Sequence, residues 1–246
     1  MYNFFINPLD VNGDKAIIKG KDHNHIKNVL RMKEGEELLL SYDKTSSLAK
    51  ISQITDEIIV CDIVNENYAN TELPVNIHLF QGLPKSDKLE LIIQKAVELG
   101  VNTITPVEMS RSIVKIEDKK NKSKIERWQA ISESAAKQSK RTIIPNILDI
   151  IPFKLALEKV ATYEHVLVPY ENEKGMSETD NAIKSIKSGE NIAIFIGPEG
   201  GFSDDEIALA KEKGGKIISL GKRILRTETA AITALSMIML HAEINL

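Results

Sequence analysis

Two glycine-rich loops in the last sixty residues carry the residue types best suited to bind a ligand. The first, Gly197 to Gly201, directly follows the apolar run 192–196, and the second begins at Gly221 after the run 216–220. Each loop leads into a segment with helical character. Because open α/β sheets bind ligands beyond the carboxyl ends of their strands, we expect the two loops to form one site.

The residues of the first loop argue against a phosphate ligand. A glycine-rich loop before a helix often binds phosphate through free amide groups and the helix dipole. Here the sequence contains neither Gly-x-x-x-x-Gly-Lys-Ser/Thr nor Gly-x-Gly-x-x-Gly, and Glu199 would repel an anion. A carboxylate is easier to reconcile with a neutral adenosine or a cationic sulfonium. A tight structural turn with a solvated Glu199 is the alternative that spacing alone leaves open.

The chain divides into two patterns of predicted secondary structure. Up to about Glu72, short runs rich in branched residues are separated by Gly, Asp, Asn and Ser, which predicts a small β-barrel. From Leu73 onward strands alternate with helices, which predicts an α/β domain with a mainly parallel sheet covered on both faces. The polar segment 66–74 contains Pro74 and is the expected boundary. We therefore expect domains at residues 1–72 and 73–246.

Periodicity and caps predict the elements that position the two loops. Ser86 and Gly100 are expected to bound one helix, and a capping box at Ser123 and Glu126 is expected to start another after a lysine-rich loop. Ser203 and Glu206 form a second such box directly after the first glycine loop. The remaining predicted elements are strands at 75–80, 102–107 and 165–169, helices at 178–188 and 229–244, and a first helical turn at Pro152.

Composition excludes several classes of protein. The net charge of −3 argues against a general polyanion binder, so any RNA contact must be local, as in the basic segments 19–33 and 137–141. A solvated charged face explains those segments equally well. The single cysteine, Cys61, excludes an intrachain disulfide and a Cys-rich metal cluster and is expected to be a small buried hydrophobe.

The same reasoning predicts a soluble cytoplasmic protein that needs no metal. The sequence contains no apolar run near the ~18 residues of a membrane span, and its N-terminal apolar stretch is too short for a signal peptide. His23 and His25 are not accompanied by a carboxylate or thiolate cluster, so they are not expected to be metal ligands.

Several separated motifs resemble one family of RNA-modifying enzymes. Residues 196–203, 219–221 and 224–231 closely resemble the SPOUT class of RNA methyltransferases, and within it the ribosomal small-subunit methyltransferase E family, which makes N3-methyluridine in 16S rRNA. The resemblance extends over most of the chain through 25–31 with Gly35, Lys88, 95–101, Arg111-Ser112, Arg127-Trp128 and 136–145. Asn24 departs from the family, which often has a second histidine there.

The resemblance implies a fold, a cofactor and partners. It implies a PUA-like barrel at the N-terminus and a SPOUT domain with a trefoil knot at about 165–235, which base rates alone would never suggest. It further implies a homodimer that acts on 16S rRNA of the 30S ribosomal subunit and binds S-adenosyl-L-methionine in the knot, through loops that include Tyr170 and Glu171. The implied cofactor-binding residues are Val168, Pro169, Ile196, Gly197, Pro198, Glu199, Gly200, Gly201, Leu220, Gly221, Ile224, Leu225, Arg226, Thr229 and Ala230. The apolar C-terminal helix could form the dimer surface or be buried in its own core.

Methylation at N3 of uridine makes specific demands on the site. N3 is not nucleophilic while it is protonated, so the site must favour the uracil anion, and Arg226 can donate hydrogen bonds to the carbonyl oxygens that take up the charge. Glu228 is the nearest carboxylate in sequence that could accept the proton, although solvent hydroxide could also do so. A glutamate in a first helical turn is also explained by the helix dipole alone.

Basic and polar residues in both domains are candidates for contact with RNA phosphates. They are Arg31, Lys33, Lys88, Arg111, Gln138 and Arg141. Because N3 faces the partner base in a duplex, the target uridine must be unpaired or flipped. Two alternatives stay open at this point: a SPOUT methyltransferase that acts on a ribose 2′-hydroxyl of another RNA, and an RNA-binding assembly factor without catalytic activity.

Overall fold

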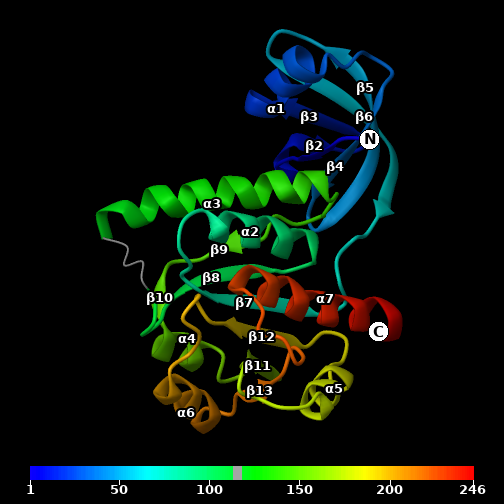
Figure 1. Ribbon diagram of the computed structural model, residues 1–246. Helices are drawn as coiled ribbons and strands as arrows, with labels where there is room; N and C mark the ends of the chain where they lie inside the picture. Colours follow the sequence, from blue (N-terminus) through cyan, green and yellow to red (C-terminus); the bar gives the residue numbers. More distant parts are fainter. Residues whose placement is uncertain (113–117) are drawn as a thin grey trace. The chain divides into compact units, whose positions relative to one another are not determined.

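The chain forms two compact units (Figure 1). The computed structural model describes the backbone of residues 1–112 and 118–246 and the side chains of 1–112 and 121–246. The first unit comprises Met1–Glu72 and Ala136–Ile144, and the second comprises Leu73–Ala135 and Pro145–Leu246. The sequence assigned residues 136–144 to the second part of the chain, whereas in the structure they belong to the first.

A six-stranded sheet forms the first unit, in the order β1-β4-β5-β6-β3-β2. Apart from the parallel pair β1 and β4, neighbouring strands are antiparallel. One apolar cluster packs on it and includes Phe4, Ile18, Leu40, Ile51 and Cys61, all nearly or fully buried. Burial raises the pKa of the Cys61 thiol to about 12, as suits a residue that acts as a small hydrophobe. The strands are β1 Asn3–Phe5, β2 Val11–Asn12, β3 Lys15–Lys19, β4 Glu37–Tyr42, β5 Thr45–Ile54 and β6 Ile58–Ala69.

The basic segment 19–33 folds as a helical connection between two strands of this sheet. A 3-10 turn, η1 (Pro8–Asp10), precedes it, and α1 (Gly20–Asn24) continues directly into η2 (His25–Leu30), which has π-helical hydrogen bonding. Arg31 ends η2 in the left-handed conformation, with a φ of 53°. These helices were not predicted, because the strand-rich pattern around them favoured β structure throughout.

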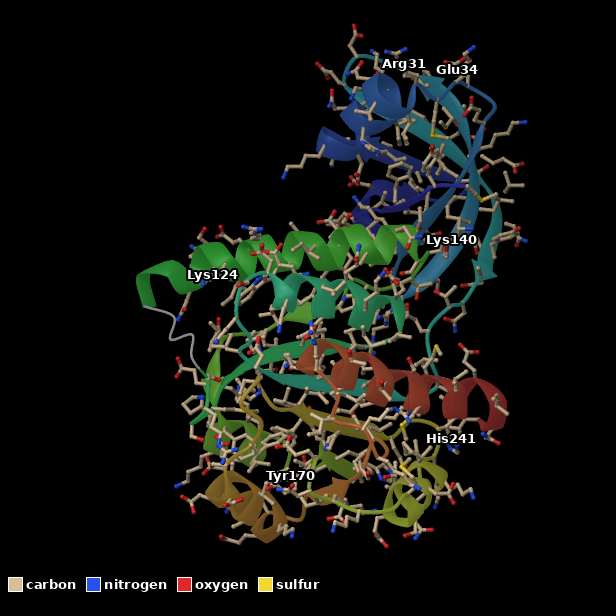
Figure 2. The ribbon with its side chains drawn as sticks, viewed as in Figure 1. Arg31, Glu34, Lys124, Lys140, Tyr170 and His241 are labelled. Carbon is tan, nitrogen blue, oxygen red and sulfur yellow. The ribbon has the colours of Figure 1, made fainter. Side chains whose placement is uncertain are left out.

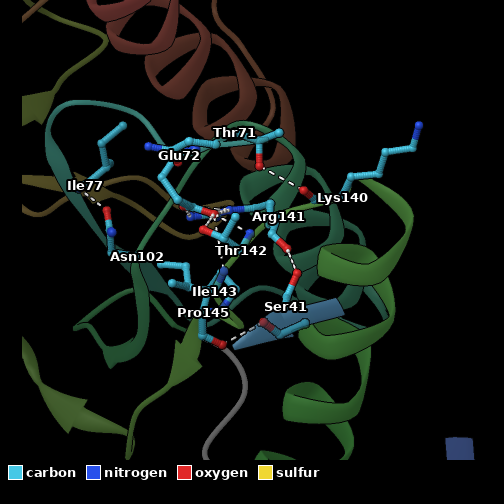
Figure 3. A network of polar contacts seen from close by, with 12 residues as sticks. Ser41, Thr71, Glu72, Ile77, Asn102, Lys140, Arg141, Thr142, Ile143 and Pro145 are labelled. Atoms are coloured by element: carbon cyan, nitrogen blue, oxygen red, sulfur yellow. Dashed lines mark hydrogen bonds and ion pairs between the residues drawn. The ribbon is translucent and has the colours of Figure 1, made fainter. Parts of the chain in front are cut away.

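A buried ion pair ties residues 136–144 to the rest of the first unit (Figure 3). Arg141 is 3% exposed, and its Nε donates to Glu72 Oε2 at 3.1 Å. The backbone N–H of Thr142 donates to Glu72 Oε1 at 2.8 Å, and the side-chain amide of Asn3 donates to the Arg141 carbonyl at 3.0 Å. A buried charge needs such a partner. Arg141 therefore has a structural role here, and the expectation that it also contacts RNA phosphates stays a prediction.

The second unit contains a seven-stranded parallel sheet in the order β10-β8-β7-β12-β11-β13, with β9 beside β8. This confirms the predicted α/β class and the predicted strands at 75–80, 102–107, 165–169, 192–196 and 216–220. The strands are β7 Asn76–Gly82, β8 Thr103–Glu108, β9 Asn146–Ile147, β10 Ile151–Pro152, β11 His165–Pro169, β12 Asn191–Ile196 and β13 Lys216–Ile218.

Helices cover both faces of this sheet (Figure 1). Helices α4 and α6 pack on one face and α2 and α7 on the other, where α7 contacts both α2 and β12. On the α4 side, the rings of Phe80 and Phe195 stack at 4.6 Å between centroids, and Phe153 meets Phe195 edge-on at 5.6 Å. The helices are α2 Lys88–Glu98, α3 Asp118–Gln138, α4 Phe153–Lys159, α5 Ser177–Lys184, α6 Asp204–Glu212 and α7 Thr227–Asn245. None of the described helices is both long and apolar enough to cross a membrane.

The structure corrects two predicted helix starts and confirms a third. Helix α3 begins at Asp118, so Ser123 lies inside the helix and does not cap it. Lysine is a good helix former, and the described part of the lysine-rich segment taken as a loop, from Asp118 onward, is helical. The rest of that predicted loop lies outside the described residues. Helix α2 starts after Ser86, which has a φ of 55° and therefore belongs to a turn. The capping box of Ser203 and Glu206 is present at the start of α6.

Candidate active site

A cavity of about 400 Å³ lies in the second unit, where the two glycine-rich loops come together. The segment after β11, the loop after β12 and the loop between β13 and α7 form its walls, as expected for the carboxyl ends of parallel strands. The lining residues are Lys88, Pro169, Tyr170, Glu171, Ile196, Gly197, Pro198, Glu199, Gly200, Gly201, Phe202, Leu220, Gly221, Arg223, Ile224, Leu225, Arg226, Thr227 and Ala230.

Most of the residues that the sequence assigns to cofactor binding line this cavity, with two exceptions. Val168 is fully buried in the apolar cluster beneath it, and Thr229 is exposed on the first turn of α7 outside the lining. The sequence interpretation missed Thr227, whose hydroxyl at the start of α7 could have been noticed as a polar group next to a glycine loop. It also assigned Lys88 to RNA, although Lys88 lines the cavity.

The glycine loop, residues 197–201, is held in place from three other segments. The Thr227 hydroxyl donates to the carbonyl of Gly197 at 2.7 Å and accepts from the buried Gln81 side chain at 2.9 Å. The Arg111 guanidinium donates to the carbonyl of Gly200 at 3.1 Å. Helix α2 supplies the third contact, through Lys88. These contacts give the loop a defined shape.

Close backbone approach explains one glycine beside this loop. A Cβ atom on Gly82, at the end of β7, would lie 2.7 Å from the backbone nitrogen and Cδ of Pro198. Only glycine lets the end of the central strand approach the loop so closely. The packing of β7 against the loop thus depends on a residue that no motif singled out.

Two carboxylates and one lysine form a charged cluster at the edge of the cavity. The ammonium of Lys88 donates to Glu199 Oε1 at 2.9 Å and lies 3.7 Å from Glu228 Oε2. Burial would raise the pKa of Glu199, but hydrogen bonds from Lys88 and from the Lys85 backbone hold it below its ordinary value. The hydrogen bond to Glu199 raises the pKa of Lys88. Glu199 and Lys88 are therefore both charged near neutral pH.

Arg226 stands apart from this cluster. It is the N-cap residue of α7, it is exposed, and it lines the cavity. Among the described residues no carboxylate forms an ion pair with it, since Glu199 and Glu228 are both directed to Lys88. Its guanidinium is free to interact with a ligand. Glu228, by contrast, is absent from the lining, and its side chain is 16% exposed.

The residues expected to contact RNA lie in different environments. Arg31, Lys33 and Gln138 are exposed on the first unit (Figure 2 shows Arg31), and Arg111 is exposed on the second. His23 is buried with its Nε2 atom 3.1 Å from the carbonyl of Thr55. Across the described residues, no group of three or more His, Cys, Asp or Glu side chains is arranged to hold a metal ion.

Comparison with known proteins identifies the family. Residues 71–239 match the model of an RNA methyltransferase domain, and residues 18–64 match that of an RNA methyltransferase PUA domain. The ribosomal RNA small subunit methyltransferase E of Bacillus subtilis is 37% identical over 92% of this chain and 90% of its own length. That of Mesomycoplasma hyopneumoniae is 36% identical over 96% of this chain and 98% of its own. The chain belongs to the ribosomal RNA small subunit methyltransferase E family.

Solved structures of this family include one with a ligand. The methyltransferase E of Neisseria gonorrhoeae, bound to S-adenosyl methionine, superposes with a TM-score of 0.82 at 32% identity over 96% of this chain and 95% of that one. Membership of the methyltransferase E family confirms the resemblance seen in residues 196–203 and 224–231.

Proposed function

We propose that this chain transfers the methyl group of S-adenosyl-L-methionine to N3 of a uridine in 16S rRNA of the small ribosomal subunit. The observation that carries the proposal is the cavity between the two glycine-rich loops, with the guanidinium of Arg226, which has no ion-pair partner among the described residues, at its edge. The family's name and the ligand of the Neisseria relative support the choice of substrate and methyl donor.

The cavity has the size and chemistry that this donor requires. Its volume falls in the range of small-molecule sites, about 300–1,000 Å³. Ile196, Leu220 and Leu225 offer apolar surface for an adenine ring, and the carboxylate of Glu171 offers a counter-charge for a cationic group. A Cβ atom built on Gly221 meets no atom within 4 Å, so the glycine leaves open space there. The residues present therefore fit the donor.

Each step of the chemistry can be assigned to residues or solvent. When bound, S-adenosyl-L-methionine supplies an electrophilic methyl group beside a positive sulfonium. Arg226 would stabilise the uracil anion by donating to its carbonyl oxygens as the charge develops. The N3 proton must leave, and Glu228 is the acceptor that the sequence suggests. Glu228 is outside the cavity lining and is paired with Lys88, which favours solvent as the proton acceptor instead.

The rest of the molecule would deliver and orient the RNA. In this proposal the first unit is a PUA-like barrel in which Arg31, Lys33 and Gln138 contact phosphates. The exposed Arg111 of the second unit also contacts phosphate, and Lys88 serves the cavity instead. Residues of about 165–235 form the trefoil knot, and α7 forms the surface of a homodimer. Leu240 and Ile244 on α7 are 53% and 75% exposed, which supports the assignment of this helix to an interface. The enzyme would work in the cytoplasm, where its substrate is.

Methylation of purified 30S subunits tests the proposal. Subunits from cells that lack the protein are incubated with it and with S-adenosyl-L-methionine carrying a labelled methyl group. The label is then located by digestion and mass spectrometry. We expect one N3-methyluridine in 16S rRNA. Label on a ribose 2′-hydroxyl would favour the rival methyltransferase, and binding without transfer would favour an assembly factor.

A further inference from the structure

Lys88 connects two of the chain segments that form the candidate site. It is the first residue of α2, Glu199 belongs to the glycine loop, and Glu228 belongs to the first turn of α7. The Nζ atom lies 2.9 Å from Glu199 Oε1 and 3.7 Å from Glu228 Oε2. The side chains of these three residues, here called the Lys88 cluster, are 33%, 27% and 16% exposed, respectively.

We propose that Lys88 is a positioning residue for the methyl donor: its ammonium holds the glycine loop through Glu199 and is itself held by Glu228. The inference rests on the proposed function, because it takes the cavity to be the S-adenosyl-L-methionine site. It replaces the role in RNA contact that the sequence suggested for Lys88.

The two carboxylates depend on this lysine. The Oε2 atom of Glu228 is buried and makes no hydrogen bond to any described residue, and the ammonium of Lys88, at 3.7 Å, is its ion-pair partner in the described structure. Apart from Lys88, the carboxylate of Glu199 accepts from the backbone N–H of Lys85, at 3.1 Å. Without the ammonium, both carboxylates lose the positive partner that the described structure gives them, and they would repel one another.

The geometry favours positioning over contact with RNA. A lysine that binds phosphate needs a free ammonium, whereas Lys88 is directed to two carboxylates and takes part in the cavity wall together with Glu199. Gly197 and Gly200 are held through their carbonyl oxygens, by Thr227 and Arg111. Glu199 lies between them, so Lys88 fixes the middle of the loop. Partly exposed ion pairs contribute little to global stability, so the effect of losing this one should be local.

Calorimetry with S-adenosylhomocysteine tests the inference on the full-length protein. We expect Lys88→Met to raise the dissociation constant about tenfold, because a loop that is no longer held must be ordered on binding. The melting temperature without ligand should stay close to that of the wild type. Lys88→Arg should restore part of the affinity, since it keeps the charge but not the compact ammonium. Lys85→Met is the matched control: it removes an exposed lysine side chain nearby and keeps the backbone donor to Glu199.

Additional variants separate the members of the Lys88 cluster. Glu199→Gln should weaken binding about as much as Lys88→Met, and it carries the test should Lys88→Met fail to fold. Glu228→Gln, whose oxygen is farther from the ammonium, should have a smaller effect. The effects of the Glu199 and Lys88 substitutions on the binding free energy should not be additive, because residues that act through one contact show strong coupling in a double-mutant cycle.

Three outcomes would overturn the inference. One is wild-type affinity in Lys88→Met together with weaker binding to 30S subunits and a shallower salt dependence, which is the behaviour of a phosphate contact. Another is a parallel fall of affinity and melting temperature in both Lys88→Met and Glu199→Gln, which is the behaviour of a general structural residue. The third is that the wild-type protein does not bind S-adenosylhomocysteine, and this result alone would also remove the proposed function.

Discussion

The two ends of the parallel sheet in the second unit both carry charged and polar side chains, but they use them differently. At the amino ends of the strands, His165 Nε2 lies 2.8 Å from Glu190 Oε2, and His78 Nδ1 lies 2.8 Å from the Thr103 hydroxyl. At the carboxyl ends, the glycine loops surround a cavity of about 400 Å³, and Arg226 at its edge forms no ion pair within the described part of the chain.

The difference shows that polarity alone does not make a site. At the amino ends, most polar groups satisfy one another: Glu190 also accepts from the backbone of Lys187, and Glu164 accepts from that of Asn191. The hydrogen bond from His165 lowers the pKa of Glu190, so this carboxylate is ionised near neutral pH. At the carboxyl ends the structure has a cavity and the guanidinium of Arg226, which no described carboxylate pairs with, and both can interact with a ligand. Substitutions at the two ends should therefore affect different measurements.

The largest effect is expected at the carboxyl ends, from Arg226→Ala. Removing a preorganised donor to a developing negative charge typically lowers the rate about 10²–10³-fold, so single-turnover methylation should fall by at least that amount. Arg226→Lys should recover only part, because an ammonium lacks the planar fork of donors. The affinity for S-adenosylhomocysteine and the melting temperature should change far less. A parallel loss of rate, affinity and stability would mean that Arg226 serves the fold, as the groups at the amino ends do.

The next effect concerns the second glycine loop. Gly221 has a φ of 110°, which L-residues rarely adopt, so Gly221→Val should distort the loop even though a Cβ atom would meet no neighbour within 4 Å. We expect calorimetry to show at least a tenfold weaker affinity for S-adenosylhomocysteine, with about 1–3 kcal/mol lost from the free energy of unfolding. As a control, Gly189→Val changes a glycine of positive φ near the amino ends and should reduce stability without reducing affinity. Equal losses of affinity in both variants would contradict the comparison.

Motifs and periodicity predicted much of this molecule, and the failures have physical causes. The parallel sheet and the first glycine loop followed from apolar runs that end in glycine, because such patterns depend on local sequence. The position of residues 136–144 did not, since it is set by a buried ion pair between Arg141 and Glu72, which are far apart in sequence. Lys88 was assigned to RNA because composition shows a charge but not its partner.

A moderate effect on stability should follow from Thr227→Val at the carboxyl ends. The Thr227 hydroxyl donates to the Gly197 carbonyl at 2.7 Å and accepts from Gln81, whose side chain is fully buried. Valine keeps the shape and leaves both partners without this bond, which should lower the free energy of unfolding by about 1–3 kcal/mol. Chemical denaturation measures this loss, and calorimetry should show weaker donor binding because Gly197 lines the cavity. Thr227→Ser, which keeps the hydroxyl, should behave nearly as the wild type, and a deficit equal to that of valine would argue that the methyl group matters instead.

The smallest effect is expected at the amino ends, where His78 should make stability depend on pH without affecting the reaction. Burial lowers the pKa of His78 below its ordinary value of 6.5, against a smaller opposing effect of the Asn191 side chain, and its Nε2 atom is buried without a hydrogen-bond partner among the described residues. Between the lowered pKa and 6.5 the unfolded chain binds more protons than the folded one, so stability must fall as the pH falls through this window.

His78→Gln removes the ring that takes up the proton, so the free energy of unfolding should depend less on pH in this variant. The change amounts to a fraction of the ~1.4 kcal/mol that one proton represents per pH unit, because the ring remains partly in contact with solvent. Chemical denaturation at pH 7.5 and 5.5 gives the loss of unfolding free energy on acidification for the wild type and for the variant. The difference between these two losses is the contribution of His78, because the other histidines contribute equally to both. Single-turnover methylation at pH 7.5 should be the same for both proteins. An equal loss of stability on acidification in the two proteins would show that His78 is not the group responsible, and a slower reaction in the variant would show that the amino ends of the sheet also serve the site.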